Sequence, residues 1–132
     1  MSKSLEGEIA LVTGASRGIG KAIANRLAAD GATVIGTATT DKGAEAITAY
    51  LQASGGKGMC LNVTDSESVA AVIKQITDEF GPVSILVNNA GIQHVAPIDE
   101  FPTEKWDAII AINMSSAFHT TAAALPFMRK AG

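Results

Sequence analysis

The sequence predicts an α/β fold: a three-layer half of a doubly wound parallel sheet, with helices on both faces. Two observations support this prediction. Short apolar runs typical of buried strands alternate with longer stretches whose apolar residues recur at helical spacing. The first strand is followed at once by a glycine-rich turn and the start of a helix. Strands and helices in this alternation form right-handed βαβ units, for which we expect the strand order 3-2-1-4.

The glycine-rich turn lies between a strand predicted at residues 8–13 and a helix predicted at residues 18–29. Its spacing is Gly-x-x-x-Gly-x-Gly, at Gly14, Gly18 and Gly20, rather than Gly-x-Gly-x-x-Gly. Glycines let a backbone approach a pyrophosphate, and the unpaired N–H groups at a helix N-terminus attract an anion. The turn therefore predicts a dinucleotide site, and a plain tight turn is the alternative.

The other elements are predicted from apolar runs, cap residues and glycine stops. We expect strands at residues 33–37, 58–62 and 84–88, and helices from Thr40 or Asp41 to Gly55, from the Thr64-Asp65-Ser66 cap signal to Phe80, and from Thr103 to about Met128. Thr103 is expected to cap the last helix, and Cys60 to be a buried, inert thiol because its neighbours are apolar.

In this topology ligands bind beyond the carboxyl ends of the strands, where the strand order reverses between the first and fourth strands. Four stretches of the chain are expected to meet there: residues 14–20, 37–40, 62–63 and 88–91.

Composition narrows the class of protein. A length of 132 residues predicts one domain, and the formal net charge of −3 leaves no basic surplus for nucleic acid. We find no apolar run near the roughly 20 residues of a membrane span, and no apolar signal core at the N-terminus. The expectation is a cytoplasmic protein with no nucleic-acid, membrane or metal partner.

The end of the second strand indicates which dinucleotide is bound. An acidic residue there normally holds the ribose hydroxyl of NAD, whereas arginine meets the 2′-phosphate of NADP. This stretch has no carboxylate until Asp41, which we expect to start the next helix, and Arg17 can reach the same corner from the glycine turn. These residues favour NADP(H) over NAD(H); a solvated arginine beside ordinary threonines is the alternative.

Two motifs at this spacing, Thr13-Gly14-Ala15-Ser16-Arg17-Gly18-Ile19-Gly20 and Asn88-Asn89-Ala90-Gly91, resemble the short-chain dehydrogenase/reductase family, and the resemblance covers the whole chain. Residues 5–92 are similar to the bacterial 3-oxoacyl-[acyl-carrier-protein] reductases, and residues 91–128 to the 3-hydroxybutyrate dehydrogenases, which use NAD. The chain therefore resembles a mosaic, and natural divergence and deliberate recombination both remain open. The family implies a Rossmann-like fold, with residues 1–132 forming one dinucleotide-binding domain that lacks the family's C-terminal half.

The resemblance also implies site residues. Arg17 and Thr39 would lie near the adenosine phosphate, Asn62 and Val63 at the adenine, and Asn88, Ala90 and Gly91 along the ribose. With the glycine turn, the implied cofactor site comprises Gly14, Ser16, Arg17, Gly18, Ile19, Gly20, Thr39, Asn62, Val63, Asn88, Ala90 and Gly91.

Of the family's catalytic set, only Asn113 is present, and a helix-break residue is the alternative interpretation. The resemblance to the 3-hydroxybutyrate dehydrogenases implies that Gln93 or His94 could hold an acid substrate, and an exposed loop is the alternative. His119 is interpreted as a packing or interface residue.

The family's reaction, hydride transfer from NADPH to a 3-oxoacyl thioester, needs a tyrosine and a lysine four residues later. The single tyrosine, Tyr50, is followed four positions later by Ser54, so we expect the chain to be inactive alone. It is either the cofactor-binding part of a reductase or a self-standing half-domain with a nucleotide-binding or structural role. The apolar region 103–128 and the open edge of the fourth strand predict a homo-oligomer.

Overall fold

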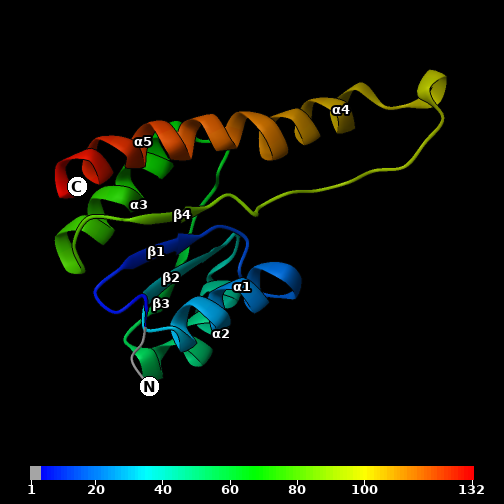
Figure 1. The fold of residues 1–132 in the computed structure, drawn as a ribbon. Coiled ribbons are helices and arrows are strands. Elements are labelled where there is room, and N and C mark those ends of the chain that lie inside the picture. The colour runs from blue at the N-terminus through cyan, green and yellow to red at the C-terminus, as the bar shows by residue number, and fades with distance from the viewer. Residues whose placement is uncertain (1–3) are drawn as a thin grey trace.

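Four parallel strands form the centre of the molecule in the order β3-β2-β1-β4 (Figure 1). The structure, a computed structural model, describes residues 4–132, so residues 1–3 of the expected domain lie outside the described residues. The elements are β1 (Ile9–Val12), α1 (Gly18–Ala29), β2 (Thr33–Ala38), α2 (Asp41–Leu51), η1 (Gln52–Ser54), β3 (Lys57–Cys60), α3 (Ser66–Glu79), β4 (Ile85–Val87), η2 (Ile98–Glu100), α4 (Thr103–Ile109), η3 (Ile110–Ser115) and α5 (Ser116–Ala131). The predicted α/β class and strand order are confirmed.

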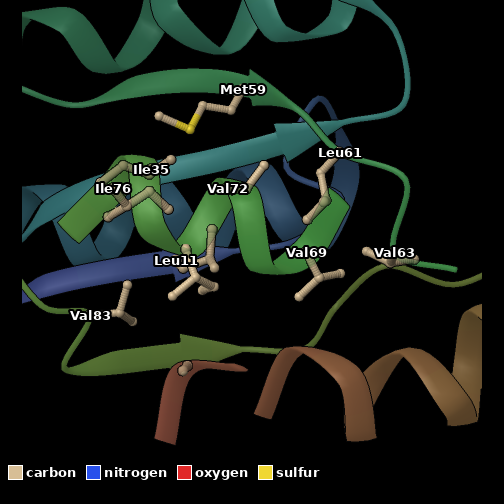
Figure 2. Close-up of a cluster of buried hydrophobic side chains, with 11 residues drawn as sticks. Leu11, Ile35, Met59, Leu61, Val63, Val69, Val72, Ile76 and Val83 are labelled. Carbon is tan, nitrogen blue, oxygen red and sulfur yellow. The ribbon is translucent and has the colours of Figure 1, made fainter. Parts of the chain in front are cut away.

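Helices cover both faces of the sheet because successive side chains of each strand point to opposite faces. In β1, Ala10 and Val12 join a cluster with residues of α1 and α2, whereas Leu11 joins the other cluster with α3 and α5. Figure 2 shows this second cluster, in which Leu11 and Ile35 of the sheet lie beside Ile76 of α3. The fold therefore has three layers, helix, sheet and helix.

The caps of α2 and α3 match the sequence. The Thr40 hydroxyl accepts a hydrogen bond from Gly43 N–H at 3.0 Å, and the Asp65 carboxylate accepts from the N–H groups of Glu67 and Ser68. Such caps satisfy backbone donors that a helix start leaves unpaired. The predicted Thr103 cap is wrong: Pro102 occupies the N-cap position, and no side chain caps α4.

The expectation that Cys60 is buried is also wrong. Cys60 is exposed, because it is the last residue of the edge strand β3 and points to the opposite side from the buried Met59. Ile19 is 75% exposed although it shares helical spacing with Ile23 and Leu27. It lies in the first turn of α1, whereas Ile23 and Leu27 pack on the sheet further along the helix.

One continuous helical stretch, Thr103–Ala131, spans 29 residues and has a mean hydropathy of 1.3 over its most apolar window. By length and composition alone it could cross a membrane, although it holds no continuous apolar run of that length. This is a weak indication, because a helix that packs on a protein core passes the same test. Here α5 buries Ser116, Thr120 and Ala124, on the side that packs toward α3 and the sheet.

Candidate functional site

A cavity of about 180 Å³ lies beyond the carboxyl ends of the strands. Its lining comes from all four of the stretches that were expected to meet at this edge of the sheet. Further lining residues come from the loop after β4 and from η3. The lining residues are Gly14, Ser16, Thr37, Ala38, Thr39, Leu61, Asn62, Val63, Ala90, Gly91, Ile92 and Ile112. The prediction that these four stretches meet where the strand order reverses is therefore confirmed.

The glycine turn at one side of this cavity needs its glycines for two reasons. Gly14 and Gly18 have φ of +66° and +60°, a region that side chains disfavour. Gly20 is needed for space, because a Cβ there would lie 2.1 Å from the Gly14 carbonyl oxygen and 2.5 Å from Asn89 Nδ2. The first turn of α1 can therefore sit directly on the strand that precedes it.

Two threonines and an asparagine connect the glycine turn to its neighbours. Thr13 Oγ1 accepts hydrogen bonds from the N–H groups of Asn89 and Ala90, both at 3.0 Å. Asn89 Nδ2 donates to the Gly14 carbonyl at 3.0 Å, and Gly14 N–H donates to Thr37 Oγ1 at 3.3 Å. These bonds tie the loops that follow β1 and β4 to each other and to the end of β2.

Tyr50 supports the same turn from α2. Its hydroxyl donates to the Ala15 carbonyl oxygen at 2.6 Å, and Lys21 Nζ lies 5.2 Å from the centre of its ring. Burial raises the pKa of the Tyr50 phenol above its ordinary value, because the charged form loses hydration. Tyr50 also packs against the buried cluster that contains Ala10 and Val12, and its bond to the turn is additional to this packing.

The corner beside the end of β2 contains hydroxyl and amide groups. Thr39 is exposed and lines the cavity, whereas Asp41 is the first residue of α2 and is absent from the cavity lining. Asn62 Oδ1 accepts hydrogen bonds from the N–H and hydroxyl of Thr64 at 3.0 and 2.6 Å, which shapes the turn that carries Val63. Arg17 stands at the N-cap of α1, exposed, with no ion pair within residues 4–132.

Two predicted site residues are engaged elsewhere. Asn88 Oδ1 accepts from Thr120 Oγ1 at 2.5 Å, so this side chain connects the end of β4 to α5. Asn113 lies in η3, a π-helical segment, and its side chain exchanges two 2.8 Å hydrogen bonds with the N–H and carbonyl of Ile92. A Cβ on Gly91 would lie 3.2 Å from Asn113 Oδ1. Asn113 therefore holds the loop after β4 against the long helix, and it does not line the cavity.

Of the predicted cofactor residues, those placed on the cavity wall are Gly14, Ser16, Thr39, Asn62, Val63, Ala90 and Gly91. Three more, Arg17, Gly18 and Ile19, are exposed at the start of α1, directly after the lining residue Ser16. Gly20 is buried beneath the turn. The sequence patterns do not predict the apolar wall residues Leu61, Ile92 and Ile112 or the connecting roles of Thr13 and Asn89. Thr13 and Asn89 each lie in one of the two family motifs, and this position is the feature of the sequence that could have pointed to them.

The side chains after Gly91 differ in exposure. Gln93 is exposed, and His94 lies edge-on to Phe101 at a centroid distance of 5.3 Å. His119 is half-buried beside Phe118, as a packing residue would be. Within residues 4–132, no group of three or more His, Cys, Asp or Glu side chains could hold a metal ion. The site therefore offers backbone N–H groups, hydroxyls, amides and one free guanidinium to an anionic ligand with an apolar part.

Comparison with known proteins agrees with this geometry. Residues 8–132 match the short chain dehydrogenase family. The chain is 54% identical over 127 residues to 3-oxoacyl-[acyl-carrier-protein] reductase FabG of Escherichia coli (strain K12) and 57% identical to FabG of Vibrio cholerae, each match covering 96% of this chain and 52% of the relative. D-beta-hydroxybutyrate dehydrogenase of Cupriavidus necator is 47% identical over 131 residues, covering 96% of this chain and 50% of the relative. The chain thus spans about half the length of these relatives, and it belongs to the short chain dehydrogenase family.

Proposed function

We propose that this chain is the NADP(H)-binding, N-terminal part of a short-chain reductase. The observation that carries the proposal is the cavity at the strand ends, whose wall joins the glycine turn to the Thr37–Thr39 stretch without a carboxylate. A dinucleotide fits this donor set, because backbone N–H groups, hydroxyls and a guanidinium all bind phosphate oxygens. The nicotinamide of the bound cofactor would supply the hydride for the family's reaction.

The preference for NADP(H) rests on charge. Asp41, the first carboxylate after β2, begins α2 instead of facing the cavity, so no acid opposes a 2′-phosphate at this corner. Arg17 stands exposed at the start of α1, and its guanidinium is a bidentate phosphate donor. We assign the adenosine phosphate to Arg17 and Thr39, the adenine to Asn62 and Val63, and the ribose side to Asn88, Ala90 and Gly91.

A cofactor titration tests this assignment. We expect NADPH to bind more tightly than NADH, and Arg17→Ala to narrow the preference by roughly 10- to 100-fold, as one charge-assisted contact of about 1.5–3 kcal/mol implies. Arg129→Ala, an exposed arginine in the last turn of α5, is the matched control and should leave both affinities unchanged. Equal affinity of the wild type for the two cofactors would contradict the role of Arg17.

The proposed reaction is the reduction of a 3-oxoacyl thioester, which the name of the FabG relatives describes. The sequence printed here holds no Tyr-x-x-x-Lys, so the 132-residue chain is expected to show no turnover by itself. Loss of a general acid alone typically lowers a rate by about 10²–10⁴-fold. Substrate-dependent NADPH oxidation by a preparation free of host reductase would contradict this proposal.

A second candidate is a 3-hydroxybutyrate dehydrogenase-like activity, favoured by the 47% identity to the Cupriavidus necator enzyme and by the stretch after Gly91. In that case Gln93 and His94 would hold an acid substrate, and NADH would bind at least as well as NADPH. A purely structural half-domain would bind neither cofactor. The same titration therefore separates the three alternatives.

We also propose a cytoplasmic homo-oligomer associated through residues 103–128. Trp106, Met114 and Phe118 lie in this region and are 55%, 66% and 69% exposed. Large exposed apolar side chains that gather on one helix mark an interaction surface.

A further inference from the structure

The hydrogen bond from Tyr50 acts on one peptide unit of the glycine turn. The hydroxyl donates at 2.6 Å to the carbonyl oxygen of Ala15, which belongs to the peptide unit that joins Ala15 to Ser16. No cis peptide occurs in residues 4–132, and a trans peptide is planar, so its N–H points opposite to its C=O. Holding the Ala15 carbonyl toward α2 therefore turns the Ser16 N–H to the side away from Tyr50.

The cavity adjoins the Ser16 end of this peptide. Ser16 lines the cavity and Tyr50 does not. Within residues 4–132 the Ser16 N–H has no hydrogen-bond partner, whereas the Ala15 N–H donates to the Thr37 carbonyl at 2.9 Å. Ala15 is fully buried, and both its N–H and its carbonyl are hydrogen-bonded, so the position of its backbone is fixed. The turn thus presents one free donor whose direction depends on the Tyr50 hydroxyl.

Close packing of α2 on the sheet brings Tyr50 within reach. A Cβ on Gly36 would lie 2.9 Å from Ile47 Cγ2 and 2.8 Å from Ala15 Cβ, so the glycine lets α2 and the turn approach β2 together. Lys21 Nζ then covers the Tyr50 ring from α1. The phenol is held between two helices and aimed at a single acceptor.

We propose that Tyr50 is a positioning residue of the dinucleotide site: it orients the Ala15–Ser16 peptide so that the Ser16 N–H donates to a phosphate oxygen of the bound cofactor. This inference rests on the proposed dinucleotide-binding function. It places Tyr50 outside the chemistry of the reaction, since the hydroxyl touches the turn rather than the ligand.

The test compares Tyr50→Phe with Thr77→Val in the full 132-residue chain. Tyr50→Phe keeps the ring and its packing but removes the hydroxyl. Thr77→Val removes a hydroxyl that donates to the Ile73 carbonyl of α3 at 2.8 Å, and Thr77 does not line the cavity. Calorimetric titration with NADPH should show a Kd roughly 3- to 10-fold higher for Tyr50→Phe, and a Kd within about twofold of wild type for Thr77→Val.

Two further measurements keep the result interpretable. The backbone amide resonance of Ser16 should shift on NADPH addition in the wild type and should already be displaced in free Tyr50→Phe. Thermal unfolding of both variants shows that each is folded, so a change in Kd is not a loss of structure.

The outcomes separate the two proposals. If the wild type binds NADPH and Tyr50→Phe binds it equally well, the positioning role is overturned and the proposed function stands. If the wild type binds neither NADPH nor NADH, the proposed function is overturned, and the role of Tyr50 with it.

Discussion

In residues 8–90 the large apolar side chains of the strands and helices, except Ile19, lie in or against two buried clusters, whereas Val95, Ile98 and Phe118 of residues 91–131 are 89%, 91% and 69% exposed. Figure 1 shows the physical reason: after β4 the chain runs away from the sheet before it turns back into α4. The helices α1, α2 and α3 each have a sheet face to cover, but much of α4 has none. The first part therefore buries most of its large apolar side chains, whereas the second leaves part of its apolar surface exposed, as the proposed association requires.

The two edge strands of the sheet, β3 and β4, also differ in how closely other elements cover them. At the β3 edge, Gly58 N–H donates to the Thr48 hydroxyl of α2 at 2.9 Å, and α2 approaches so closely that a Cβ on Gly58 would lie 2.1 Å from the Ala44 carbonyl oxygen. Within residues 4–132 β4 pairs only with β1, and no strand covers its other edge. An edge with unpaired backbone groups invites pairing with a further strand.

Two matched isoleucine substitutions, one in each region, should differ most in their effect on stability. Ile76 of α3 is fully buried and Ile98 of η2 is 91% exposed. We expect Ile76→Ala to lower the free energy of unfolding by about 2–5 kcal/mol, because it leaves a cavity in the core, and Ile98→Ala to change it by less than about 0.5 kcal/mol. Urea unfolding measures both, and equal losses would show that Ile98 is buried in the protein in solution.

A glycine substitution tests how tightly the turn is packed. Gly20→Ala places a methyl group against the Gly14 carbonyl oxygen, so we expect a loss of about 1–3 kcal/mol in the free energy of unfolding together with weaker NADPH binding. Ala22→Ser changes an exposed side chain of the same helix and serves as the control. An unchanged NADPH affinity in Gly20→Ala would show that the turn can shift without affecting the cavity.

The apolar surface of residues 103–128 is tested by light scattering over a dilution series. We expect an oligomer whose dissociation constant rises about 5-fold or more in Phe118→Ser, since a large aromatic side chain at an interface often contributes about 1 kcal/mol or more. Gln75→Ser, on the exposed side of α3, should have no effect. A wild-type monomer at every concentration would contradict association through this region.

The smallest expected effect concerns pH. Burial raises the pKa of Tyr50 in the folded chain, so the folded state holds this proton more tightly than the unfolded state does. Its contribution to stability is fully present below the unfolded pKa and is lost as pH rises through the folded pKa. Urea unfolding from about pH 8 to pH 11 should therefore show a steeper alkaline decline for wild type than for Tyr50→Phe. Parallel profiles would show that the phenol is solvated.

The α/β class, the strand order and the stretches that meet at the cavity could be predicted from the sequence alone. They depend on local patterns: apolar periodicity in α3, the Asp65 cap, and glycines such as Gly14 where the backbone turns. Such signals lie within a few consecutive residues, and the topology rules for parallel sheets carry them to the shape of the fold.

Only the tertiary structure decided which side chains connect these stretches. The bonds from Tyr50 to Ala15 and from Asn113 to Ile92 join residues 35 and 21 positions apart, and the exposure of Cys60 and Ile19 depends on which neighbours reach them. Periodicity assigns a residue to a face of a helix or strand, but it does not say where along that element the covering layer ends. That depends on how the helices lie across the sheet, which is set by packing between segments distant in sequence.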